Sequence, residues 1–114
     1  MDYPTAYRFL THQGQAQSSD PEALLMRLRQ GQPPVPGQVT TCLLALKVVY
    51  EGLRGAPTLE RDLVNALYVL TQDSRHWFED GQRRNITWPP LLGEDLRRIQ
   101  DAVRAIFADA WPAP

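Results

Sequence analysis

The chain has 114 residues, of which 43% are hydrophobic and 22% charged, and this composition fits a single globular domain, residues 1–114, that folds without disulfide or metal. Its 12 basic and 13 acidic residues are mixed along the chain, so there is no positive patch of the kind that binds nucleic acid or an acidic membrane surface. With one cysteine, no signal pattern and no apolar run long enough for membrane insertion, we expect a cytoplasmic protein.

Two short helices are predicted before residue 32. The first is capped by Asp2, has a proline in its first turn and ends at Gly14. The second begins at Asp20-Pro21-Glu22 and ends near Gly31. Prolines dominate residues 33–37 and remove amide donors there, which predicts a stiff, extended connector.

Three long helices are predicted after the connector, over about 38–54, 58–80 and 90–110, because apolar residues recur there with a period of 3.6. Thr58 is expected to cap the middle helix and Gly81 to end it. The link Gly55-Ala56-Pro57 is so short that the first two long helices should pack directly, as an antiparallel hairpin that forms the core.

No alternating run of β-branched residues and no internal repeat occurs in the sequence. The predicted fold class is therefore all-α, a small helical bundle with three long helices and two short N-terminal helices.

Arginine and tryptophan are close together in the sequence between residues 75 and 88. These two residue types dominate the energetics of protein interfaces, and the residues concerned are Arg75, Arg83, Arg84 and Trp88. An exposed Trp88 beside the arginines would mark a partner surface. The alternative is that Trp77 and Trp88 are core residues whose indole N–H groups find internal acceptors. The proline-rich connector is the second choice of contact surface.

Catalytic signatures are absent from the sequence, which has no phosphate-binding glycine loop, no GxSxG, no CxxC pair, no HExxH and no dinucleotide fingerprint. Cys42 lies among apolar residues, where burial would leave its thiol inert. The best candidate for a metal site is a group of acidic residues and a histidine at helical spacing, which could supply half of the ligands: Asp73, His76, Glu79 and Asp80. We predict no catalytic residue, no cofactor and no metal, and keep a metal-dependent enzyme as the third hypothesis.

Aromatic residues on the long helices suggest a different function. Helices that part to hold an apolar ligand or pigment would use Tyr50, Tyr68, Trp77 and Phe107. The same spacing also suits an ordinary core. The helices of so short a chain leave apolar faces uncovered. A second copy of the chain could cover such a face, and we therefore expect a homodimer.

Four segments of the chain resemble a family of short cyanobacterial proteins of uncharacterised function: residues 33–40, 43–49, 56–59 and 88–92. The resemblance covers most of the chain and implies a cyanobacterial cytoplasm. Some members carry the label dethiobiotin synthetase. ATP-dependent dethiobiotin synthetases use a glycine-rich phosphate loop ending in Lys and Ser or Thr, and this sequence has no such loop. The functional hypothesis is a non-enzymatic helical interaction module, acting as an adaptor, assembly factor or regulator.

Overall fold

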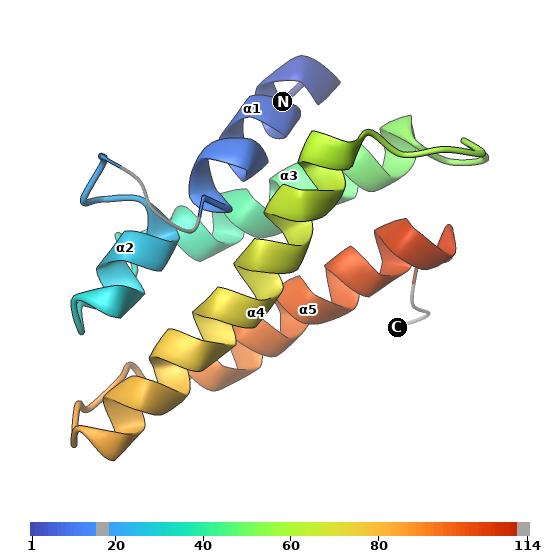
Figure 1. Ribbon diagram of the computed structural model, residues 1–114. Helices are drawn as coiled ribbons and strands as arrows, with labels where there is room; N and C mark the ends of the chain where they lie inside the picture. The colour runs from blue at the N-terminus through green and yellow to red at the C-terminus, as the bar shows by residue number, and fades with distance from the viewer. Residues whose placement is uncertain (16–18, 112–114) are drawn as a thin grey trace.

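The computed structural model describes residues 1–15 and 19–111 and contains five α-helices and no strand within those ranges (Figure 1). The all-α prediction is confirmed, with two short helices followed by three longer ones. Their bounds are α1 Tyr3–Gln13, α2 Leu24–Arg29, α3 Gln38–Gly52, α4 Arg61–Arg83 and α5 Leu92–Ala108.

α1 begins and ends as the sequence predicts. The Asp2 side chain accepts a hydrogen bond from the Thr5 amide at 2.9 Å, and Pro4 occupies the first turn, where its missing N–H has no partner to lose. Gly14 follows the last turn and lies against the carbonyl of Ala66 in α4, so closely that a Cβ atom would collide with it. The glycine therefore allows α1 and α4 to approach each other.

α4 is the longest helix, with 23 residues, and its ends differ from those predicted. It begins at Arg61 after Glu60, so Thr58 does not cap it, and it ends at Arg83, with Gly81 inside its last turns. Gly81 is buried, and a Cβ atom there would lie 2.7 Å from Cε2 and Nε1 of Trp88. Its role is to make room for an indole ring, not to stop the helix.

The prediction that α3 and α4 pack directly as the core pair is wrong. Close contacts join α1 with α3, α3 with α5, α2 with α4, α1 with α4, and α4 with α5, whereas α3 and α4 make little direct contact. The reason is the connection, because α3 ends at Gly52 and α4 starts only at Arg61. These eight intervening residues project from one end of the molecule (Figure 1) and allow the two helices to cross with α1 and α5 packed against both.

α3 and α5 run parallel to each other. At their N-terminal ends Val39 and Leu92 line the same hollow, and beyond their C-terminal ends the Asp109 carboxylate accepts a hydrogen bond from the Gly55 amide at 3.0 Å. Side chains from all five helices form one core. Its largest buried side chains, each exposed by 2% or less, are Leu10, Leu24, Leu25, Leu28, Cys42, Leu46, Val49, Leu63, Leu67, Leu70, Leu92 and Ile99.

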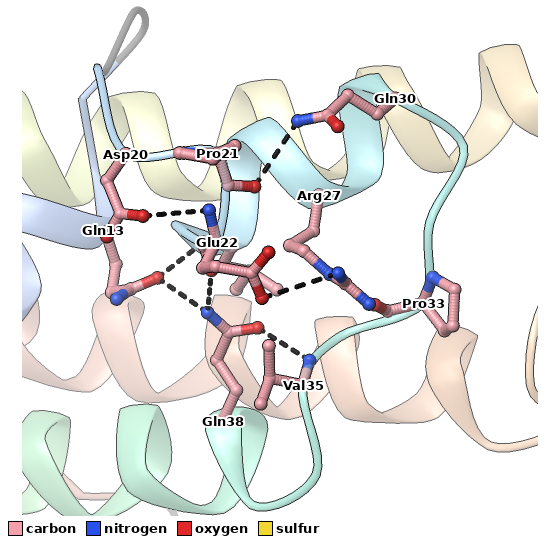
Figure 2. Close-up of polar contacts among 10 residues, drawn as sticks. Gln13, Asp20, Pro21, Glu22, Arg27, Gln30, Pro33, Val35 and Gln38 are labelled. Carbon is pink, nitrogen blue, oxygen red and sulfur yellow. Dashed lines mark hydrogen bonds and ion pairs between the residues drawn. The ribbon is translucent and has the colours of Figure 1, made fainter.

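The side chains of Gln13 and Gln38 form hydrogen bonds that link α1, the start of α2, the proline connector and α3 (Figure 2). The Gln13 side-chain oxygen accepts hydrogen bonds from the Leu24 amide and from the Gln38 side chain. Gln38 also donates to the Glu22 carbonyl at 2.8 Å and accepts from the Val35 amide at 3.0 Å. Residues 33–37 are non-helical, as predicted, and this network fixes their position at the start of α3.

Candidate protein-interaction surface

The three arginines favoured by the sequence do not form one surface. Arg75 and Arg84 are nine positions apart, and a rotation of about 100° per residue puts them on opposite sides of the helix axis. Arg75 pairs with Glu79 at 3.3 Å and donates to Gln100 of α5 at 3.5 Å. Arg83 and Arg84 instead share the carboxylate of Asp80, at 3.7 and 2.9 Å. This one carboxylate offsets half of their positive charge.

Trp88 belongs to the core, so the structure decides between the two sequence alternatives for this residue. Its side chain is 9% exposed, and its Nε1 donates a hydrogen bond to the Phe78 carbonyl at 2.9 Å. The ring stacks on that of Phe78, with centroids 6.1 Å apart, in the space left by Gly81. The expectation of an exposed Trp88 beside the arginines is corrected, because this buried indole cannot contact a partner.

Two of the three acidic residues proposed as half of a metal site are engaged with arginines. Glu79 pairs with Arg75, and Asp80 pairs with Arg83 and Arg84. Across residues 1–15 and 19–111, no three or more His, Cys, Asp or Glu side chains are arranged so that they could hold a metal ion. Burial raises the pKa of the Cys42 thiol to about 12, which leaves it protonated and a poor nucleophile at neutral pH.

The four aromatic residues considered for an apolar ligand lie in different surroundings. Tyr50 is buried against Trp111 at the end of α3, and Trp77 lies beneath the guanidinium of Arg29 from α2, 5.5 Å from its ring centroid. Tyr68 and Phe107 are exposed and border an open groove between α4 and α5. The four side chains therefore do not enclose a common cavity.

A second apolar groove, which we call the α3–α5 groove, follows the seam between the two parallel helices. Near their N-terminal ends is a hollow of about 230 Å³, whose apolar walls are Pro34, Val35, Val39, Leu91 and Leu92. Further along the same seam is a hollow of about 310 Å³, whose apolar walls are Leu43, Ala102 and Trp111. Leu91 is 61% exposed at one end, and Leu44, one helical turn after the lining residue Thr40 of α3, is 50% exposed. Isolated exposed leucines are common, but a series of apolar side chains along one seam makes the α3–α5 groove a candidate contact surface.

Trp111 forms the far wall of the α3–α5 groove and is held from two sides. Its backbone amide donates to the Tyr50 hydroxyl at 2.9 Å, and the two rings lie 5.0 Å apart. The ammonium of Lys47 lies 4.1 Å from the Trp111 ring centroid, which adds a cation–π attraction. Arg98 and Asp101 provide charges beside this second hollow, so the apolar floor has a polar rim.

The sequence alone did not reveal this groove. Leu43 and Leu92 belong to apolar stripes that predict burial, and only the parallel packing of α3 and α5 leaves Leu43 half-buried at a seam. One signal was present: the connector, named as a second contact surface, contributes Pro34, Val35 and Gly37 to the first hollow.

Comparison of the chain with protein-family models, with curated proteins and with solved structures finds no match. Among the described residues, no helix is both long enough and apolar enough to cross a membrane.

Proposed function

We propose that this protein is a non-enzymatic interaction module that binds an amphipathic helix of a partner protein in the α3–α5 groove. The observation that carries the proposal is the series of apolar side chains that line the two hollows of the α3–α5 groove, with Leu91 and Trp111 exposed at its ends. Amphipathic helices bind such grooves through apolar residues spaced by one or two turns.

The geometry of the groove suits a helix better than an extended peptide. Along α3 the lining residues Val39 and Leu43 are four positions apart, about 6 Å, and along α5 the lining residues Leu92 and Ala102 are ten positions apart, about 15 Å. Apolar side chains one to three turns apart on a bound helix span these distances. The groove lies between side chains, so no sheet edge with free backbone donors and acceptors is offered to an extended chain.

The charges at the rim favour a partner helix with both signs on its flanks. Arg98 pairs with Asp95 at 3.3 Å, and Lys47 pairs with Glu51 at 3.3 Å, so each rim presents a cation beside an anion. Binding would then depend mainly on apolar burial and only weakly on salt.

Affinity capture from a cyanobacterial lysate, chosen because of the resemblance described above, tests the proposal. The test variant is Leu44→Glu/Leu91→Glu, which places charge on two exposed positions beside the groove without disturbing the core. The matched control is Arg83→Ala/Arg84→Ala, which removes two exposed arginines on another part of the molecule. The proposal predicts a partner that is captured by wild type and control and lost with the groove variant; equal capture by all three would refute it.

A small apolar ligand is the second candidate function, supported by the hollow between Leu43, Ala102 and Trp111. Trp111 lies in the wall of this hollow, so a ligand bound there would change its fluorescence. Titration of the protein with a panel of apolar dyes, with Trp111→Leu as the control, tests this alternative. Saturable quenching that disappears in the variant would support it, and no saturable change in the wild type would exclude it.

A further inference from the structure

The outer face of α5 carries a stripe of charges that make no ion pair or side-chain hydrogen bond with the described part of the chain. Glu94, Arg97, Asp101 and Arg104 follow one another at spacings of three, four and three, so they lie along one side of the helix, and all four are exposed. None of them takes part in the ion pairs or side-chain hydrogen bonds found among residues 1–15 and 19–111. By contrast, the neighbouring Asp95 and Arg98 pair with each other.

The order of these charges is self-complementary. The stripe has the signs minus, plus, minus, plus from Glu94 to Arg104. A two-fold axis that runs between two copies of α5, at right angles to both and at the level of Ile99, places position 97 of one copy opposite 101 of the other and position 94 opposite 104. Each exchange brings opposite charges together, Arg97 against Asp101 of the second copy and Glu94 against Arg104 of the second copy. A parallel arrangement in the same register would instead oppose like charges.

The apolar surface beside the stripe fits the same arrangement. Tyr68 and Phe107 are 59% and 45% exposed and border a hollow of about 390 Å³ between α4 and α5. On the other side of Ile99 the same seam holds Gly93, above the ring of Phe78 and beside Arg75. The two-fold brings position 107 of one copy level with position 91 of the other. Because helical side chains lean toward the N-terminus, the Phe107 ring comes close to Gly93 of the second copy, where no side chain projects.

We propose that the protein forms an antiparallel homodimer through the outer face of α5, in which Arg97 pairs with Asp101 and Glu94 pairs with Arg104 across the two-fold. Closed two-fold dimers are the commonest homo-oligomers, and their interfaces are self-complementary in this way. This dimer uses the outer face of α5 and the α4–α5 side. It shares Asp101 with the rim of the α3–α5 groove, but the charge pattern that supports it does not require a partner in that groove.

Charge reversal tests the register of the dimer as well as its existence. Each dimer contains the 97–101 contact twice. In Arg97→Asp both contacts place a carboxylate against Asp101 of the other copy, and in Asp101→Arg both place an arginine against Arg97 of the other copy. Each variant alone should have a dimer dissociation constant raised by at least about tenfold, because two attractive pairs become repulsive. When the two variants are mixed, every such pair is again Asp against Arg, so a heterodimer should form with an affinity close to that of the wild type.

The measurement is sedimentation velocity over a wide protein concentration range at low and high salt, with circular dichroism to verify folding of each variant. The control is Arg61→Asp, which reverses an exposed charge on α4 that is not in the stripe and should leave the dimer unchanged. If these residues instead paired within one copy of α5, mixing the two variants would not restore the pairs, so recovery on mixing is specific to contacts between copies. A wild type that remains monomeric at the highest concentration, single variants that dimerise like the wild type, or mixed variants that remain monomeric would each overturn the proposal.

Discussion

Replacing Gly81 by alanine should destabilise the protein, although the same change inside a helix is normally favourable. In an ordinary helical position the loss of glycine flexibility stabilises by about 0.5–1 kcal/mol. Here the added Cβ would lie 2.7 Å from Cε2 and Nε1 of Trp88, whose ring is packed on Phe78. The ring has to move, and its hydrogen bond to the Phe78 carbonyl is strained or lost.

The magnitude follows from two opposing contributions. Overpacking of a filled site costs about 1–3 kcal/mol, and loss of the indole hydrogen bond adds about 1 kcal/mol or more. After the helix-propensity gain is subtracted, Gly81→Ala should lower the free energy of unfolding by about 1–3 kcal/mol. For a domain of this size each 1 kcal/mol corresponds to a decrease of roughly 4 °C in Tm.

Urea denaturation of four variants checks this reasoning. Gly93→Ala is the matched control, because a Cβ there would make an ordinary contact with the Phe78 ring at 3.4 Å, and the change should be neutral or stabilising by up to about 1 kcal/mol. In the double variant Gly81→Ala/Trp88→Phe the smaller ring leaves space for the methyl group. Its loss of stability should therefore be smaller than the sum of the losses measured for Gly81→Ala and Trp88→Phe alone. A Gly81→Ala protein as stable as wild type would show that the indole does not occupy the space beside Gly81.

Three other predictions concern buried polar groups, the thiol and acid stability. Gln13→Ala removes the acceptor of the Leu24 amide and should destabilise by about 1–3 kcal/mol in urea, whereas the exposed Gln15→Ala should have almost no effect; equal effects would contradict the network in Figure 2. Because burial raises the pKa of Cys42 to about 12, a maleimide should label the thiol at pH 8 only after unfolding, and rapid labelling of the native protein would contradict its burial. Hydrogen bonds from Thr5 to Asp2 and from His12 to Asp20 lower the pKa of both carboxyl groups in the folded protein. The two carboxylates therefore stabilise the fold fully above their ordinary pKa of 3.8, and this stabilisation is lost as the pH falls through the lower pKa values of the folded state. Thermal melts from pH 7 to pH 3 should therefore fall less steeply for Asp2→Asn than for wild type, and parallel curves would exclude this contribution from Asp2.

Local sequence signals predicted most of the helices. Asp2, Pro4 and Gly14 define α1 through capping, and the 3.6-residue period identifies α3, α4 and α5, because both effects act over a few neighbouring residues. The prediction that Gly81 ends α4 failed because of a tertiary contact. A glycine near the end of an apolar stripe usually ends a helix, but here Trp88, seven residues later, occupies the space of the missing side chain.

Contacts between helices were harder to predict than the helices themselves. The short Gly55-Ala56-Pro57 segment favoured direct packing of α3 and α4, but α3 ends earlier and α4 begins later than the periodicity indicates. Only the resulting parallel packing of α3 and α5 determines that Leu43 and Leu91 lie at a surface seam. Apolar periodicity distinguishes the two faces of one helix, but it does not tell which neighbour covers each face.

Site-specific photocrosslinking tests the proposed function most directly. A photoreactive phenylalanine analogue is placed at position 91, at the end of the α3–α5 groove, or at position 8, on the exposed side of α1. If a partner helix binds in the groove, illumination in a lysate should yield one discrete heavier adduct from position 91 and none from position 8, and this adduct should be absent when Leu44→Glu is added. Identical adducts from both positions, or none from position 91, would contradict the assignment of the α3–α5 groove as the partner-binding surface.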